Sequence, residues 1–117
     1  MNGLMRSKIC SLSRSEDFKS LLSGKKITNK YLTIFFKKLS DKDSKKLNIS
    51  FVTKKKIGNA VKRNKIKRIL KSIMNEAVKN IYLNLNYSYL LIAKSSILND
   101  NYNIIKEVLF NNLKKIK

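Results

Sequence analysis

The side chains with the clearest chemistry lie between residues 53 and 71. Three consecutive lysines precede a Gly58-Asn59 pair, and six more lysines and arginines follow between residues 60 and 71. Cations at the start of a helix oppose the helix dipole and repel one another, so folding alone would not select this arrangement. A phosphate backbone would, because it accepts the charges and the free N–H groups together. The candidate RNA-binding residues are Lys54, Lys55, Lys56, Asn59, Lys62, Arg63, Asn64, Lys65, Lys67, Arg68 and Lys71.

A basic face on an ordinary solvated helix is the alternative interpretation of this segment. The apolar positions Ile66, Ile69, Leu70, Ile73, Ala77 and Ile81 follow a 3.6-residue period and predict one long helix. Asn64, Lys67, Arg68 and Lys71 fall on the opposite side of that helix. The three lysines at 54–56, expected at the end of a strand, converge on the same corner, which favours binding of a polyanion.

The composition supports this interpretation. The chain has 117 residues, with 27 Lys and Arg against 7 Asp and Glu, which gives a formal net charge of +20. Such a charge repels itself in a compact fold and is tolerated most readily beside a polyanion, nucleic acid first and an anionic membrane second. The length predicts a single domain over 1–117, and 43% hydrophobic residues suffice for a core.

Several other chemistries are weakened by what the chain lacks. It has no His, and its seven carboxylates are scattered, so neither an acid–base pair nor a two-metal site stands out. The single cysteine, Cys10, allows no intrachain disulfide and no thiolate cluster. No apolar run approaches the ~20 residues that span a membrane, and no signal peptide is visible. We therefore expect a cytoplasmic protein with no catalytic residue and no metal ligand of its own.

Periodicity and turn residues predict the order α-β-β-β-α-β-α in an α+β fold, a small mixed sheet with helices packed on it. We expect a flexible basic arm over residues 1–12 and a folded domain over 13–117. The expected elements are a helix from a capping box at 13–16 to Gly24, strands at 26–28, 31–38 and 47–54, a loop at 41–46, the long helix, a doubly buried strand at 87–93, and a final helix capped by Asp100.

Residues 55–68, KKIGNAVKRNKIKR, resemble the central motif of the protein subunit of bacterial ribonuclease P, with Lys65 in place of the second arginine of that motif. The resemblance extends along most of the chain. Asp17-Phe18 with Gly24 resembles the first-helix pattern, Asn29-Lys30 precedes the first long strand, and residues 89–94 resemble a late strand that ends in Ala-Lys. Three further departures are Leu22 for an aromatic residue, Asn48 for Arg and Ser50 for Gly.

The resemblance implies an accessory subunit of a ribonucleoprotein endonuclease that removes the 5′ leader of precursor tRNA. The RNA subunit, with bound Mg²⁺, would be the catalyst, and one monomeric protein would bind each catalytic RNA. The 55–71 segment would dock on that RNA, and a concave face between the first helix and the sheet would hold the leader. The matching leader-binding positions are Phe18, Thr33 and Phe35, and Tyr31 could join them.

The residues alone leave Phe18 and Phe35 open to an ordinary core role. The implied fold is an α/β sandwich with a left-handed crossover between parallel strands, where general rules favour a right-handed one.

Three alternatives belong to other classes. A small structural or ribosomal RNA-binding protein explains the charge and the size, but not the order of the central motif. A DNA-binding helix module would need readable base-contacting side chains and usually a dimer interface, and neither is apparent. A membrane-surface protein fits less well, because the basic helix uses its apolar face for the core.

Overall fold

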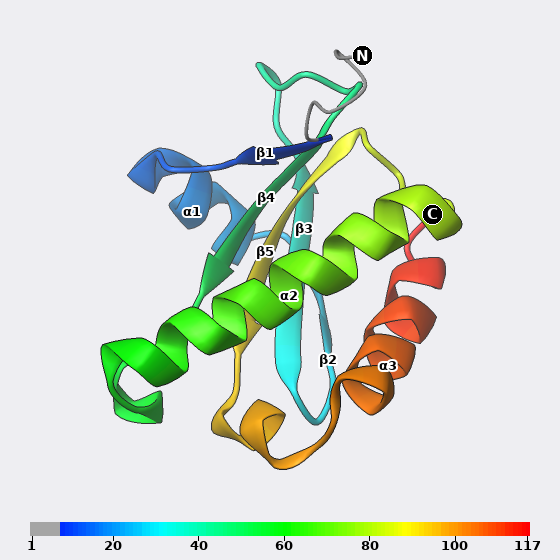
Figure 1. Ribbon diagram of the computed structural model, residues 1–117. Helices are drawn as coiled ribbons and strands as arrows, with labels where there is room; N and C mark the ends of the chain where they lie inside the picture. The colour runs from blue at the N-terminus through cyan, green and yellow to red at the C-terminus, as the bar shows by residue number, and fades with distance from the viewer. Residues whose placement is uncertain (1–7) are drawn as a thin grey trace, which may run out of the picture.

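The computed structural model describes residues 8–117 and contains one five-stranded mixed sheet with helices on both faces (Figure 1). The strand order across the sheet is β1-β4-β5-β3-β2. The α+β prediction is confirmed. The elements are β1 (Ile9–Ser11), α1 (Ser15–Leu22), β2 (Lys25–Thr28), β3 (Leu32–Lys38), β4 (Leu47–Val52), η2 (Lys55–Ile57), α2 (Ala60–Asn80), β5 (Tyr87–Ala93), η3 (Ser95–Asn99) and α3 (Tyr102–Lys114).

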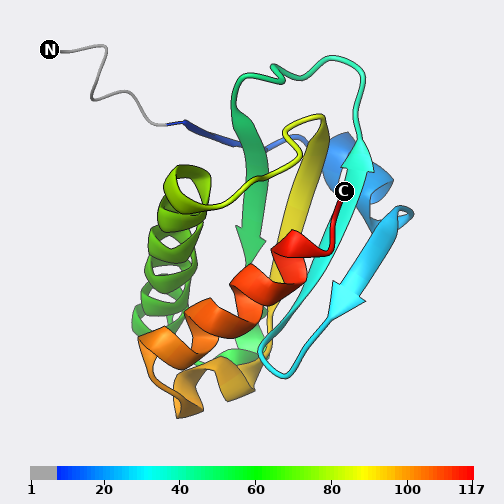
Figure 2. The same ribbon diagram turned by 90° about the vertical axis from the view of Figure 1, so that its right-hand side faces the viewer.

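Helices α2 and α3 cover one face of the sheet, and α1 lies on the other (Figure 2). Strands β4 and β5 are parallel neighbours joined through α2. In Figure 1 both strands run downward, α2 passes in front of them, and β5 lies to the right of β4. This geometry makes the crossover left-handed, as the family resemblance implies and against the usual right-handed rule.

The main core lies between the sheet and the helix pair α2 and α3. The predicted 3.6-residue pattern of α2 is confirmed, since Ile66, Leu70, Ile73 and Ala77 are fully buried. A second, smaller cluster forms beneath α1 around Leu12, Leu21 and Leu90. Strand β5 therefore contributes buried side chains to both faces, as its unbroken apolar run predicts.

The prediction of a flexible arm over residues 1–12 is wrong for residues 9–12. Residues 9–11 form β1, which pairs in parallel with β4 in the register Ile9↔Leu47. Leu12 is buried in the cluster beneath α1, and its N–H donates to the Ile49 carbonyl. The free edge of β4 and the space under α1 hold this segment in place. Residues 1–7 of the expected arm lie outside the described residues.

Three expected element boundaries also differ from the structure. The capping box at 13–16 does not form: Arg14 is the N-cap of α1 and makes no side-chain cap bond. Asn101, rather than Asp100, caps α3 through the Ile104 N–H, because the Asp100 carboxylate accepts the Tyr31 hydroxyl instead. Strand β4 ends at Val52, and the expected strand-end lysines lie in and beside the 3₁₀ turn η2.

Candidate RNA interface

The Gly58-Asn59 junction sets the direction in which α2 leaves the sheet. Gly58 has a φ of 155°, a backbone conformation that favours glycine. The Asn59 side chain accepts the Lys62 N–H at 3.0 Å and so caps α2. The Arg63 Nε donates to the Gly58 carbonyl at 3.2 Å, which closes the turn onto the helix. Asn59 and Arg63 therefore have folding roles beside any contact with RNA.

The side of α2 that faces away from the core carries three cations and one amide. Asn64, Lys67, Arg68 and Lys71 are all exposed, and we call them the α2 basic face. Lys62 and Lys65 are also exposed and flank this face. None of these cations takes part in any ion pair found among residues 8–117, and the first turn of α2 contains no acidic side chain. Their charges are available to an anionic partner.

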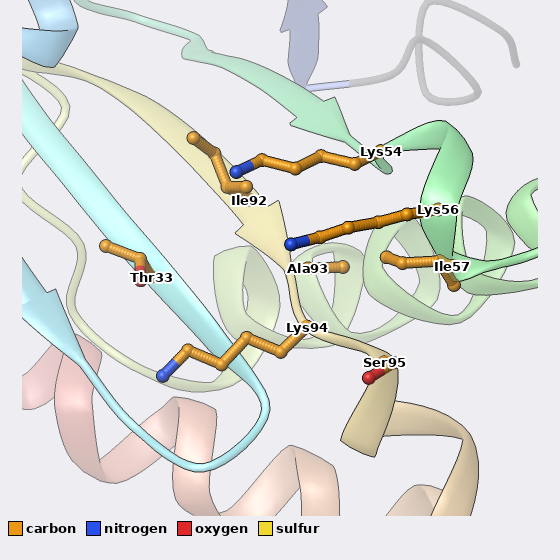
Figure 3. A pocket seen from close by; sticks show the side chains of 8 residues that line it. All are labelled: Thr33, Lys54, Lys56, Ile57, Ile92, Ala93, Lys94 and Ser95. Carbon is orange, nitrogen blue, oxygen red and sulfur yellow. The ribbon is translucent and has the colours of Figure 1, made fainter.

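A second basic region surrounds a pocket of about 430 Å³ at the end of β5 (Figure 3). Lys54 and Lys56 extend into it from the turn after β4, and Lys94 enters from the end of β5. Lys55 does not line it and is exposed. The pocket is lined by Thr33, Lys54, Lys56, Ile57, Ile92, Ala93, Lys94 and Ser95. Two of the lysines predicted to contact the catalytic RNA thus lie with Thr33, one of the predicted leader-binding residues.

The pocket continues onto the face of the sheet that α1 covers in part. On this face Thr33 of β3 pairs with Ile92, and Phe35 pairs with Leu90. Phe18 of α1 packs against the same cluster as Phe35, and both rings are half-buried. Three of the four predicted leader-binding residues, Phe18, Thr33 and Phe35, are therefore brought to one surface with part of each side chain exposed.

Tyr31 does not join this surface. Only 3% of it is exposed, and its ring packs in the main core on the α2 and α3 side. Its hydroxyl donates to the Asp100 carboxylate, and this hydrogen bond is the main cause that raises the pKa of Tyr31 and lowers the pKa of Asp100. The prediction that Tyr31 contacts the leader is wrong, since a base cannot stack on a buried ring.

Lys94 was missing from the predicted site. Its Nζ donates to the Asn29 carbonyl at 2.7 Å, and its backbone N–H donates to the Tyr31 carbonyl at 2.8 Å. The strand-ending pair Ala93-Lys94 is visible in the sequence, but only the parallel pairing of β5 with β4 shows that this lysine lines the same pocket as Lys54 and Lys56.

Two of the departures from the family pattern have clear structural consequences. Asn48 is buried, and its amide donates to the carbonyls of Asp43 at 3.0 Å and Lys46 at 3.3 Å. It fastens the loop between β3 and β4 rather than presenting a polar group to solvent. Leu22, at the end of α1, is 52% exposed.

Two further findings concern metal sites and membrane-spanning helices. Among residues 8–117, no three His, Cys, Asp or Glu side chains come together in a way that could hold a metal ion. Within the same range, no helix has both the length and the apolar character needed to cross a membrane.

Comparison with known proteins decides the family. A family model described as Ribonuclease P matches residues 7–117. The chain belongs to the ribonuclease P protein family.

Relatives and solved structures of the family agree along most of the chain. The Ribonuclease P protein component of Carboxydothermus hydrogenoformans is 33% identical over 110 residues, covering 91% of this chain and 90% of the relative. That of Mycoplasma mycoides is 28% identical over 106 residues, covering 91% and 94%. The RNase P protein of Thermotoga maritima matches with a TM-score of 0.76 at 27% identity, covering 92% of this chain and 97% of that one. A Staphylococcus aureus RNase P protein shares the fold, with a TM-score of 0.73 at 23% identity, covering 91% and 93%.

Proposed function

We propose that this protein binds the catalytic RNA of ribonuclease P and the 5′ leader of precursor tRNA, and so assists removal of the leader. The observation that carries this proposal is the presence of two adjacent cationic surfaces of different character. One is the exposed α2 basic face, whose cations make no ion pair within residues 8–117. The other is the lysine-lined pocket that continues onto a sheet face bearing half-buried aromatic rings.

The α2 basic face suits a folded RNA. Its side chains project from a rigid helix, so they are held at fixed spacing against a phosphate backbone. Its four members follow the i, i+3, i+4, i+7 spacing of one helix side: Asn64, Lys67, Arg68 and Lys71. Each phosphate contact releases condensed counterions, so the affinity falls steeply with salt. Arg68 can bind a phosphate through two N–H groups, while Lys65 acts as a point charge.

The pocket and the adjoining sheet face suit single-stranded RNA. Lysines at 54, 56 and 94 would follow the leader backbone, while Phe18 and Phe35 offer ring surface to bases. Stacking of a base on an aromatic side chain contributes about 1–3 kcal/mol and tolerates any base. Leaders differ in sequence from one tRNA to the next, so a surface that tolerates any base fits this substrate.

The chemistry of cleavage would belong to the RNA. Mg²⁺ bound by the RNA subunit would activate the attacking water and stabilise the leaving oxygen. The protein would supply no catalytic group and would act as one monomer on each catalytic RNA. Its contribution is to hold the substrate and to neutralise phosphates near the cleavage site.

Binding of precursor and mature tRNA by the reconstituted holoenzyme tests this proposal. We expect the complex with this protein to bind the precursor more tightly than the mature tRNA, and the RNA alone to show a smaller difference. If the protein binds the catalytic RNA tightly but changes neither affinity, it acts as a structural RNA-binding protein and the proposal fails.

A further inference from the structure

A buried ion pair joins α1 to the loop between β3 and β4. Asp17, in the first turn of α1, is 7% exposed, and its Oδ2 lies 2.9 Å from the Nζ of Lys42. The hydrogen bond to Asp17 is the main cause that raises the pKa of Lys42. Two charges removed from water in this way gain little net stability, so the pair calls for another explanation.

A second ion pair of opposite polarity lies beside the first. Arg14, the N-cap residue of α1, places its Nη1 3.2 Å from the Oδ2 of Asp41. Arg14 at the start of the helix thus pairs with Asp41 of the loop, and Asp17 of the helix pairs with Lys42 of the loop. The loop is itself fastened to β4 by the buried amide of Asn48. A continuous set of polar contacts therefore runs from β4 through the loop to the start of α1.

Charged contacts replace apolar packing at this end of α1. A cavity of about 310 Å³ lies between the loop and the segment from β1 to α1, and Asp17, Asp41 and Lys42 line it. Among the eight residues of α1, only Leu21 is a fully buried apolar side chain. The helix is too short to be stable without tertiary contacts. Its position over the sheet depends on the residues that hold its two ends.

The C-terminal end of α1 is fixed by the backbone. A Cβ at Gly24 would lie 2.7 Å from the Phe36 carbonyl oxygen, so the turn after α1 touches β3 directly. On the N-terminal side, the Leu12 N–H donates to the Ile49 carbonyl of β4, and the two ion pairs then fasten the first turn of α1 to the loop. Phe18 directly follows Asp17 and packs on the same cluster as Phe35.

We propose that the Asp17–Lys42 pair sets the position of α1 over the sheet and thereby holds Phe18 where the leader is bound. Asp17 is then a positioning residue, since it acts through Phe18 and the helix rather than by touching RNA. This inference rests on the proposed function, because it gives the pair a role only if the leader lies between α1 and the sheet.

The test compares two leader lengths in the reconstituted holoenzyme. Asp17→Asn is measured beside Glu107→Gln, which removes the same charge from an exposed position on α3 that makes no ion pair within residues 8–117. For Asp17→Asn we expect kcat/KM to fall on the order of tenfold, the loss of about one stacked base, for a precursor with a long leader. With a single-nucleotide leader we expect no change. Glu107→Gln should match the wild-type protein with both substrates.

A second variant guards against simple unfolding. Asp17→Asn/Lys42→Gln leaves no unpaired buried charge, so it keeps the fold, and its affinity for the catalytic RNA reports that fold. We expect the same leader-dependent loss as for Asp17→Asn alone, because the two residues act as a unit. Equal losses with both leaders, or no loss in the double variant, would overturn the inference. If even the wild-type protein shows no benefit from a long leader, the proposed function fails first.

Discussion

Lys56 and Lys94 approach one pocket from elements that lie 38 positions apart in the sequence, the turn after β4 and the end of β5. The parallel pairing of β4 with β5 brings the two strand ends together, so the lysines that follow them line one pocket. Helix α2 follows β4 through η2, so it begins at the same corner. Thus one topological feature places the pocket beside the α2 basic face.

Replacing Arg68 by Ala tests the α2 basic face. The side chain is exposed and makes no ion pair within residues 8–117, so its loss should not affect folding. We expect weaker binding to the catalytic RNA, with the slope of log K against log salt reduced by about 0.7–0.9. Lys79→Ala, at the other end of the same helix, is the control and should leave both quantities unchanged. An equal loss in the two variants would mean that only net charge matters.

Lys56→Ala tests the pocket, with Lys55→Ala as its neighbour control. Lys56 lines the pocket, whereas Lys55, in the same turn, does not. We expect Lys56→Ala to reduce the preference of the holoenzyme for precursor over mature tRNA by several-fold. Lys55→Ala should leave that preference intact, whatever it does to binding of the catalytic RNA. Titrating each tRNA into the holoenzyme gives the ratio of the two affinities. If Lys55→Ala reduced this ratio more than Lys56→Ala, the leader would not bind in this pocket.

The sequence predicts the elements that carry strong periodicity and misses those that depend on a neighbour. The spacing in α2 and the apolar run in β5 specify burial directly. Strand β1 has only three residues and no alternation, and it forms because the edge of β4 accepts it. No local pattern in residues 9–11 contains that information.

Tyr31 shows that the alternation of a strand cannot be extended past the residue at which the strand begins. The sequence places it on one face with Thr33 and Phe35, but β3 begins at Leu32. Residue 31 lies in a turn where the Asn29 side chain accepts the N–H groups of Tyr31 and Leu32. The turn rotates the tyrosine into the core. Similarly, the 3₁₀ turn at 55–57 separates Lys56 from α2 and directs it into the pocket.

Asn59→Ala and Asn101→Ala form a matched pair of helix-cap variants. Each side chain accepts a backbone N–H at 3.0 Å, from Lys62 and Ile104 respectively. We expect each change to lower the free energy of unfolding by about 1 kcal/mol, measured by urea denaturation. Only Asn59→Ala should also weaken binding to the catalytic RNA, because the first turn of α2 carries Lys62 and Arg63. Equal RNA affinities in the two variants would show that this turn makes no contact.

Tyr31→Phe should make the protein less stable at neutral pH, and by less at acid pH. The Tyr31 hydroxyl is the main cause that lowers the pKa of Asp100, followed by Lys30. A lowered pKa stabilises the folded state above the ordinary aspartate pKa of about 3.9, and this stabilisation is lost as the pH falls through the lowered value. Urea denaturation should show a difference in the free energy of unfolding between wild type and variant that is smaller at pH 3 than at pH 7. A gap independent of pH would show that the carboxylate does not respond to this hydroxyl.

Cleavage of a precursor tRNA by a bacterial ribonuclease P RNA at low Mg²⁺ tests the central claim most directly. The reaction is run with the RNA alone, with the RNA and this protein, and with the protein alone. We predict that the protein stimulates removal of the 5′ leader and has no activity by itself. Tight binding to the RNA without stimulation, or cleavage by the protein alone, would contradict this account.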